Sequence, residues 1–146
     1  MNAPLRLETQ LCFALYAASR AMAQAYQPLL TPLGLTYPQY LAMLVLWETD
    51  GISVKQLGER LQLDSGTLTP LLKRLETAGL LQRQRCASDE RCVLLHLTSS
   101  GMALQLPAAQ IAHKLQQQQS PSGNSDESTE LRQQLQLLVL QLQQGK

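Results

Sequence analysis

The stretch that most constrains the fold runs from residue 51 to residue 97, where helical periodicity gives way to strand-like runs. The segments ISVKQLGERLQL and DSGTLTPLLKRLETAGL each carry apolar residues at helical spacing. Ser53 and Asp64 are suited to cap the two helices, and Gly79 is suited to end the second. The runs LLQRQRC and CVLLHLT, joined by ASDER, predict a β-hairpin with a charged tip. The expected order is therefore helix, short turn, helix, hairpin.

This order is typical of a winged helix-turn-helix, in which the second helix enters the major groove of DNA and its N-terminal side chains meet the base edges. Hydroxyl groups there can bond to phosphates or bases, a glycine allows close approach of a phosphate, and basic residues further along can reach the backbone. An arginine at the hairpin tip, oriented by an aspartate, can enter the minor groove. The predicted DNA-binding residues are Ser65, Gly66, Thr67, Thr69, Lys73, Arg74, Asp89 and Arg91.

The distribution of charge along the chain supports DNA binding more than the net charge does. The formal net charge is +1, which does not by itself indicate a nucleic-acid partner. Residues 55–91, however, hold seven of the 12 basic residues against five acidic ones. A solvated charged face would give the same count, so the charge supports the motif without proving it.

The remaining chain reads as helices on either side of this region. A helix is expected over 7–27, broken by Pro28 and Pro32, and another from Thr36 or Tyr37 to Asp50-Gly51. A helix from Thr98 or Ser99 to about Leu115 and a last one over 130–144 follow, joined by a polar connection over 116–129. The predicted fold is mainly α with a small antiparallel β-wing. Residues 51–97 form its DNA-binding region, and residues 1–50 and 98–146 its helical dimerisation region, within one continuous domain.

Three segments, GLTYPQYLAMLVLWE, LGERLQLDSGTLTPLLKRLETAGLL and SDERCVLLHLT, closely resemble the MarR family of winged-helix repressors over roughly residues 5–115. With QLCFALYAASRAM, Tyr26 and Tyr37, the chain resembles the organic-hydroperoxide-sensing branch, often called OhrR. The resemblance implies a homodimeric repressor that binds double-stranded operator DNA. It also implies that oxidation of Cys12 by an organic hydroperoxide lowers the affinity for DNA.

The spacing of Cys12 and Tyr26 places a condition on any contact between them. They share a helix face within about 40°, yet they lie about 21 Å apart along the axis, so they cannot touch within one helix. Two copies packed antiparallel, crossing near Ser19, would bring Cys12 of one chain to Tyr26 of the other, and Tyr37 could join. Phenol hydroxyls donating to the sulfur would favour the thiolate.

Such a thiolate would attack the terminal oxygen of an alkyl hydroperoxide and become a sulfenic acid. Apolar neighbours are expected to favour an organic peroxide over an inorganic one; they are Phe13, Leu15, Met22, Met43 and Trp47. Without the resemblance, a buried cysteine of purely structural role is the more common case.

The fate of the oxidised sulfur is limited by the other cysteines. Residues 98–118 contain none, so a resolving cysteine in the helix after the wing is excluded. Capping by a small thiol, as a mixed disulfide, is the expected outcome, with further oxidation or a bridge to Cys86 or Cys92 as alternatives. Those two cysteines face each other across the hairpin, and simple strand packing is expected there rather than a bridge.

Several classes of protein are disfavoured by what the sequence lacks. No leader pattern and no apolar run of membrane-spanning length is present, so a cytoplasmic protein is expected. No spacing of Cys and His suits a metal, and no cofactor is expected. Two alternatives stay open: a repressor of the same family released by a small non-oxidant ligand, and a thiol peroxidase. The second lacks a cysteine placed for turnover, and a non-enzyme is expected.

Overall fold

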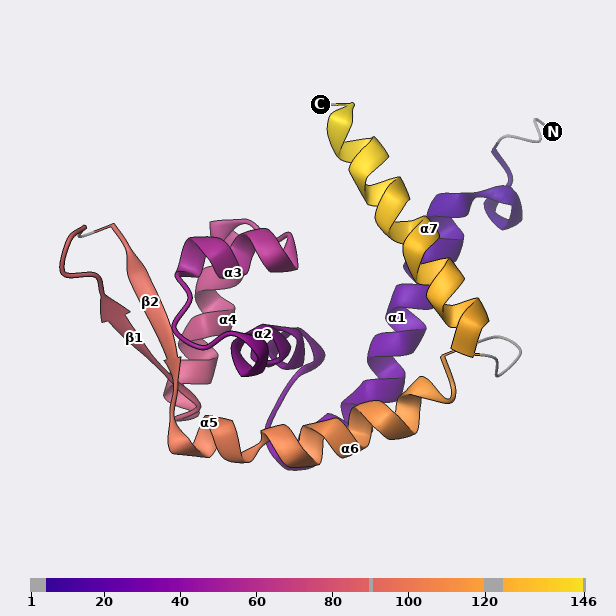
Figure 1. Cartoon of the computed structure of the whole chain (residues 1–146). Helices are drawn as coiled ribbons and strands as arrows, with labels where there is room; N and C mark the ends of the chain where they lie inside the picture. Colours follow the sequence, from indigo (N-terminus) through magenta and orange to yellow (C-terminus); the bar gives the residue numbers. More distant parts are fainter. Residues whose placement is uncertain (1–4, 90, 120–124, 146) are drawn as a thin grey trace. The chain divides into compact units, whose positions relative to one another are not determined.

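The computed structural model describes residues 5–89, 91–119 and 125–145. It divides into two compact units, Met1–Ala108 and Ala109–Lys146, and each is described by itself. As Figure 1 shows, both are built of helices, and the first also carries a two-stranded antiparallel sheet. The elements are η2 (Leu7–Thr9), α1 (Leu11–Leu30), η3 (Thr31–Leu33), α2 (Tyr37–Glu48), α3 (Val54–Leu61), α4 (Ser65–Thr77), β1 (Leu81–Arg85), β2 (Val93–Leu97), α5 (Ser99–Ala103), α6 (Gln105–Gln116) and α7 (Ser125–Gln144).

Three helices of the first unit begin at side-chain caps that the sequence predicts. Thr36 and Ser53 each form a capping box with the glutamine three residues later, at the starts of α2 and α3. Asp64 accepts a hydrogen bond of 2.8 Å from the Thr67 backbone N–H at the start of α4. Gly79 follows α4 with a φ of 77°, which a glycine adopts at no steric cost. The boundaries of the helix-turn-helix are thus set locally.

The core of the first unit surrounds α2. Ala42, Met43 and Leu46 of this helix have no exposed surface. Fully buried leucines from the surrounding elements pack in the same core; they are Leu30, Leu35, Leu57, Leu68, Leu72, Leu75, Leu81 and Leu95. Burial of this many large side chains holds α3, α4 and the hairpin as one body.

The hairpin is fastened to the chain segment that precedes α3. β1 pairs with β2 in the register Leu81↔Leu97 to Arg85↔Val93. On the other edge of β2, Leu95 N–H donates to the Ile52 carbonyl at 2.8 Å, and Gly51 N–H donates to the Leu95 carbonyl at 2.9 Å. The Asp50 carboxylate accepts from Leu97 N–H at 2.8 Å. These bonds fix the base of the hairpin beside the helix-turn-helix.

The first helix was expected to begin at residue 7, but α1 begins at Leu11, because the short η2 and the extended Gln10 precede it. Three further sequence-based boundaries were wrong, two of them at prolines. Pro28 lies inside α1, near its end, because one missing N–H and the local crowding are tolerated there; the chain leaves the helix through η3 and Gly34, whose φ is 73°. The helix expected from Thr98 to Leu115 is interrupted at Leu104, since Pro107 has no N–H for the Ala103 carbonyl.

The third error concerns the polar connection before the last helix. Residues 125–129, assigned to that connection, form the first turns of α7. Asp126 and Glu127 lie in the first turn, where negative charge stabilises a helix. The part of the connection at 120–124 lies outside the described residues. No single described helix is long and apolar enough to cross a bilayer; only residues 11–33 and 37–48 together meet that measure, as a pair bent by 72°.

Candidate nucleic-acid interface and cysteine site

Helix α4 presents its polar face to solvent. Leu68, Leu71, Leu72 and Leu75 bury the opposite face in the core. Every α4 residue predicted to bind DNA is exposed; they are Ser65, Gly66, Thr67, Thr69, Lys73 and Arg74. The pKa of the capping Asp64 carboxyl is lowered because it accepts hydrogen bonds from the Thr67 backbone and hydroxyl. The helix that would enter a DNA groove is therefore fixed at its N-terminus by an anionic cap.

Pro70 does not break this helix. It has no N–H to donate to the Gly66 carbonyl, yet α4 is continuous from Ser65 to Thr77. The Thr69 hydroxyl donates to the Ser65 carbonyl at 2.8 Å, which satisfies the neighbouring backbone acceptor. The proline thus leaves the exposed hydroxyl face of the first turns of α4 in place.

In the wing loop, Asp89 holds the backbone of Arg91. The Asp89 carboxylate accepts a hydrogen bond of 2.9 Å from the Arg91 N–H, and the Asp89 carbonyl accepts one of 3.1 Å from the Cys92 N–H. The aspartate was expected to orient the guanidinium; in the structure its carboxylate accepts from the Arg91 main chain instead. Asp89 thereby shapes the loop that carries the arginine, and both side chains are exposed.

A groove of about 500 Å³ joins the helix-turn-helix to the wing. Thr69 of α4, Lys55 of α3 and Arg91 of the wing line it together. The other lining residues are Ser53, Val54, Leu72, Arg83, Asp89, Cys92 and Val93. Three predicted residues, Thr69, Asp89 and Arg91, are thus brought to one site.

Sequence reasoning missed two cations of this groove, Lys55 and Arg83, although both lie in the basic segment. Arg83 of β1 donates to the Glu76 carboxylate of α4 through Nη2 at 2.9 Å and Nε at 3.2 Å. These hydrogen bonds lower the pKa of the Glu76 carboxyl. The charge of Arg83 is therefore partly neutralised, and its hydrogen bonds link the wing to α4. Lys55, in contrast, is exposed at the start of α3.

The two wing cysteines are joined, which corrects the expectation of simple strand packing. Cys86 and Cys92 form a disulfide with a Cα–Cα distance of 5.3 Å, and Cys86 N–H donates to the Cys92 carbonyl at 2.9 Å. The pair continues the register one step beyond Arg85↔Val93. An antiparallel pair at that distance lies within the usual range for a disulfide, so strand pairing itself brings the sulfurs together.

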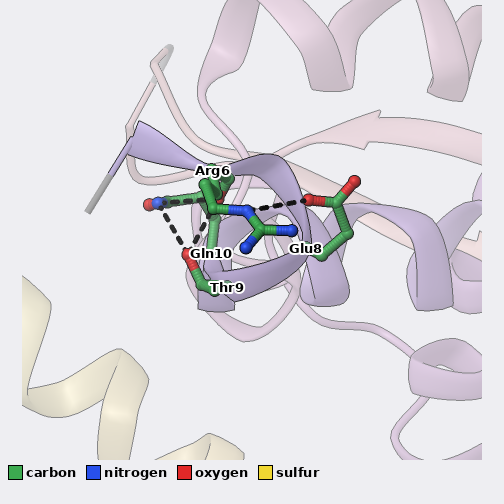
Figure 2. Close-up of polar contacts among 4 residues, drawn as sticks. All are labelled: Arg6, Glu8, Thr9 and Gln10. Carbon is green, nitrogen blue, oxygen red and sulfur yellow. Dashed lines mark hydrogen bonds and ion pairs between the residues drawn. The ribbon is translucent and has the colours of Figure 1, made fainter. Parts of the chain in front are cut away.

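Cys12 is the free cysteine of the structure, and it is exposed. It is the second residue of α1 and lies in the first turn of that helix. The turn before it is closed by local hydrogen bonds, shown in Figure 2: Thr9 Oγ1 donates to the Arg6 carbonyl at 2.9 Å, and Gln10 Nε2 donates to the same carbonyl at 3.0 Å. Figure 2 also shows the ion pair of Arg6 and Glu8, at 4.0 Å.

The tyrosines gather at the other end of α1. Tyr26 of α1 packs against Tyr37 and Tyr40 of α2 as tilted rings, with centroids 5.2 and 5.3 Å away. Burial, and secondarily the neighbouring Tyr26, raises the pKa of Tyr37. Burial, and after it the neighbouring Tyr26 and Tyr37, raises the pKa of Tyr40 to about 12. The Tyr37 and Tyr40 phenols are therefore neutral hydrogen-bonding groups at any physiological pH.

Tyr40 was absent from the predicted site, although its position three residues after Tyr37 on a helix was a usable signal. Within one chain the cluster is separated from Cys12 by fourteen residues of α1, about 21 Å of helix. Of the apolar residues expected around Cys12, Met43 is fully buried in the core and Trp47 donates its indole N–H to the Gly101 carbonyl at 2.9 Å. Phe13 and Met22 are each 39% exposed on α1.

The helix pair α3–α4, the hairpin wing and the groove between them define a winged helix-turn-helix protein. Comparison with known proteins refines this class. The model of the MarR family matches residues 35–93. The organic hydroperoxide resistance transcriptional regulator of Bacillus subtilis is 56% identical over 107 residues, which are 73% of each chain. This chain belongs to the MarR family.

Solved structures agree over nearly the whole chain. Reduced AbfR bound to DNA superposes with a TM-score of 0.81 at 36% identity, covering 95% of this chain and 96% of the other. AbfR of Staphylococcus epidermidis superposes with a TM-score of 0.73 at 38% identity, covering 93% of this chain and 95% of the other. The relative from B. subtilis is a transcriptional regulator, and AbfR was solved bound to DNA. The site is therefore interpreted as that of a DNA-binding protein of this family and not as that of an enzyme.

Proposed function

We propose that this chain is a cytoplasmic, redox-sensing repressor whose reduced form binds operator DNA and whose oxidation at Cys12 by an organic hydroperoxide releases it. The observation that carries the DNA-binding part is the groove in which Thr69, Lys55 and Arg91 meet from three separate elements. A hydroxyl on a helix that fits the major groove, with cations on both sides, suits a phosphate backbone and base edges. The similarity of this chain to the organic hydroperoxide resistance regulator of B. subtilis and to DNA-bound reduced AbfR supports the same assignment.

Dimerisation is part of the proposal, because both units leave large apolar side chains exposed. On α1, Leu11 is 62% exposed and Tyr16 is 59% exposed. On α7, Leu137 and Leu142 are 66% and 65% exposed. Patches of this kind are typical of surfaces that a second subunit covers. Sedimentation at micromolar concentration should give a dimer, and a stable monomer would contradict the proposal.

For the sensor, we place the Cys12 sulfur of one subunit beside the Tyr26 and Tyr37 hydroxyls of its partner. In this arrangement the phenols donate to the thiolate, which attacks the distal oxygen of the hydroperoxide. The O–O bond breaks, the alkoxide leaves and takes a proton to become an alcohol, and the sulfur becomes a sulfenic acid. A small thiol then condenses with the sulfenic acid, releasing water and leaving a mixed disulfide on Cys12.

The experiment that tests the function compares wild type with Cys12→Ser. DNA selected from a random library by the reduced wild type serves as the ligand, and fluorescence anisotropy measures binding. Cumene hydroperoxide should release the wild type, whereas Cys12→Ser should bind with similar affinity and stay bound. Release of Cys12→Ser by the peroxide would refute the sensor role. Release by a non-oxidant ligand alone, or turnover of peroxide with a thiol reductant, would support the alternative repressor or a peroxidase instead.

A mixed dimer tests whether the tyrosine acts from the partner subunit. One subunit carries Cys12→Ser and the other carries Tyr26→Phe, so the remaining Cys12 faces an intact Tyr26 only across the interface. The rate of oxidation of that cysteine should match the wild-type rate per site, while the Tyr26→Phe homodimer should react more slowly. Equal, slow rates in both dimers would mean that Tyr26 acts within its own chain, and equal rates at the wild-type level would mean that Tyr26 does not act on the sulfur.

A further inference from the structure

We propose that Cys86 and Cys92 form a reversible dithiol–disulfide couple in the wing, which reacts with low-molecular-weight disulfides and tunes DNA affinity separately from Cys12. The dependence on DNA rests on the proposed function; the thiol chemistry does not. The structure joins the two sulfurs, and both residues are half-buried between exposed neighbours at positions 85, 87 and 91. A disulfide at such a site can be reached by a small thiol, unlike one in a core.

The backbone supplies the geometry that allows the bond to open and close again. The hydrogen bond from Cys86 N–H to the Cys92 carbonyl, 2.9 Å, belongs to the strand ladder and does not require the S–S bond. The Arg85↔Val93 pair just below it keeps the two chains in register. The cysteines therefore remain opposite each other in the dithiol form. Once one of them has reacted with a small disulfide, this proximity favours formation of the protein disulfide over reaction of the second cysteine with another small molecule.

The exchange proceeds in two balanced steps. The thiolate of one wing cysteine attacks a sulfur of the small disulfide, forming a mixed disulfide and expelling one small thiolate, which takes up a proton. The second cysteine, as thiolate, attacks the protein sulfur of that mixed disulfide and expels the second small thiolate, which is also protonated. Two protein thiols are oxidised to one disulfide, and one small disulfide is reduced to two thiols.

The consequence for DNA follows from what the bond encloses. Cys86 and Cys92 are six positions apart, and the loop between them carries Asp89 and Arg91. Asp89 and Arg91 line the groove together with Cys92 itself. In the disulfide form the ends of the loop are also joined covalently, so Asp89 and Arg91 have less conformational freedom to lose when DNA binds. In the dithiol form the ladder hydrogen bonds still pair the ends, but the loop keeps more freedom that DNA binding must remove, which is expected to weaken affinity by about 3- to 10-fold.

The test uses Cys12→Ser as the background, so that every thiol readout belongs to the wing. The protein is equilibrated in mixtures of reduced and oxidised glutathione, quenched with acid, alkylated and analysed by mass, and parallel samples are titrated with the selected DNA. We expect one two-electron transition between disulfide and dithiol. DNA affinity should fall as the couple is reduced, and the two curves should have the same midpoint. The matched control, Cys12→Ser with Cys86→Ser and Cys92→Ser, should bind at the weaker level at every ratio. Single variants should take up one glutathione each.

Three results would overturn the proposal: a wing pair that stays dithiol in the most oxidising mixture, one that stays bonded in the most reducing mixture, or a transition that leaves DNA affinity unchanged. Failure of the proposed function is distinguishable from these. In that case the wing pair titrates as expected, and neither form binds the selected DNA.

Discussion

Replacement of Gly101 by alanine should destabilise the first unit more than any other change of one methyl group that we consider. Gly101 lies in α5, between the base of the wing and α2. A Cβ built there would lie 2.2 Å from the Leu80 carbonyl oxygen and 3.2 Å from Leu97 Cδ2. The Leu80 carbonyl also accepts from Thr98 N–H at 3.1 Å, so moving it away breaks a second contact. Relief therefore requires a shift of α5 as a whole.

The expected cost combines three contributions. Overpacking in a tight site costs about 1–3 kcal/mol, and this contact with backbone lies at the upper end. The shift also weakens the bond from Trp47 to the Gly101 carbonyl, worth about 1 kcal/mol. The higher helix propensity of alanine relative to glycine offsets up to about 1 kcal/mol of this loss of stability. The net loss is about 2–3 kcal/mol, or roughly 5–10 °C in midpoint for a chain of this size.

Gly66→Ala is the matched control. It also places a methyl group in a helix, but the nearest atom to its Cβ is Asp64 Oδ1 at 3.6 Å, an ordinary contact. It should be neutral or stabilising by up to about 1 kcal/mol. Urea unfolding at fixed protein concentration, followed by circular dichroism and by the emission of Trp47, the one tryptophan, measures both variants. An unchanged midpoint for Gly101→Ala, or an equal loss in both variants, would refute the reasoning.

Arg91→Ala should weaken binding to the selected DNA by about 1–3 kcal/mol, and Lys73→Ala should weaken it on all sequences while reducing the salt slope by about one; unchanged affinity in both would exclude this binding mode. The pKa of Tyr40 is raised by folding to about 12, so its contribution to stability is complete below about pH 10 and is lost as the pH rises toward 12. Tyr40→Phe should flatten that alkaline loss in thermal melts, and an unaltered pH dependence would count against the burial of a neutral phenol. The pKa of Asp64 is lowered by its cap bonds, so its contribution is present above about pH 4 and is lost as the pH falls below that value. Asp64→Asn, which caps without titrating, should reduce the acid dependence, and melts at several pH values that match wild type would contradict this.

The sequence by itself determined the helix-turn-helix and the wing, because their boundaries depend on neighbouring residues. Ser53 and Asp64 bond to N–H groups three positions away, and Gly79 adopts a positive φ in its own turn. The leucine spacing of α4 is equally local, since helix geometry alone puts those side chains on one face. The exposed residues of α4 could therefore be named before any tertiary structure was known.

Tertiary structure alone decided which distant side chains meet. The groove unites Lys55, Thr69 and Arg91, and the aromatic cluster adds Tyr40 to Tyr26 and Tyr37. The wing disulfide also depends on tertiary structure, because the strand register places Cys86 opposite Cys92. The spacing of the two cysteines in the sequence does not by itself impose that register. Caps and periodicity act over a turn of chain, whereas these contacts are fixed by how α2, α4 and the hairpin pack around a shared core, and packing is a property of the whole unit rather than of any segment.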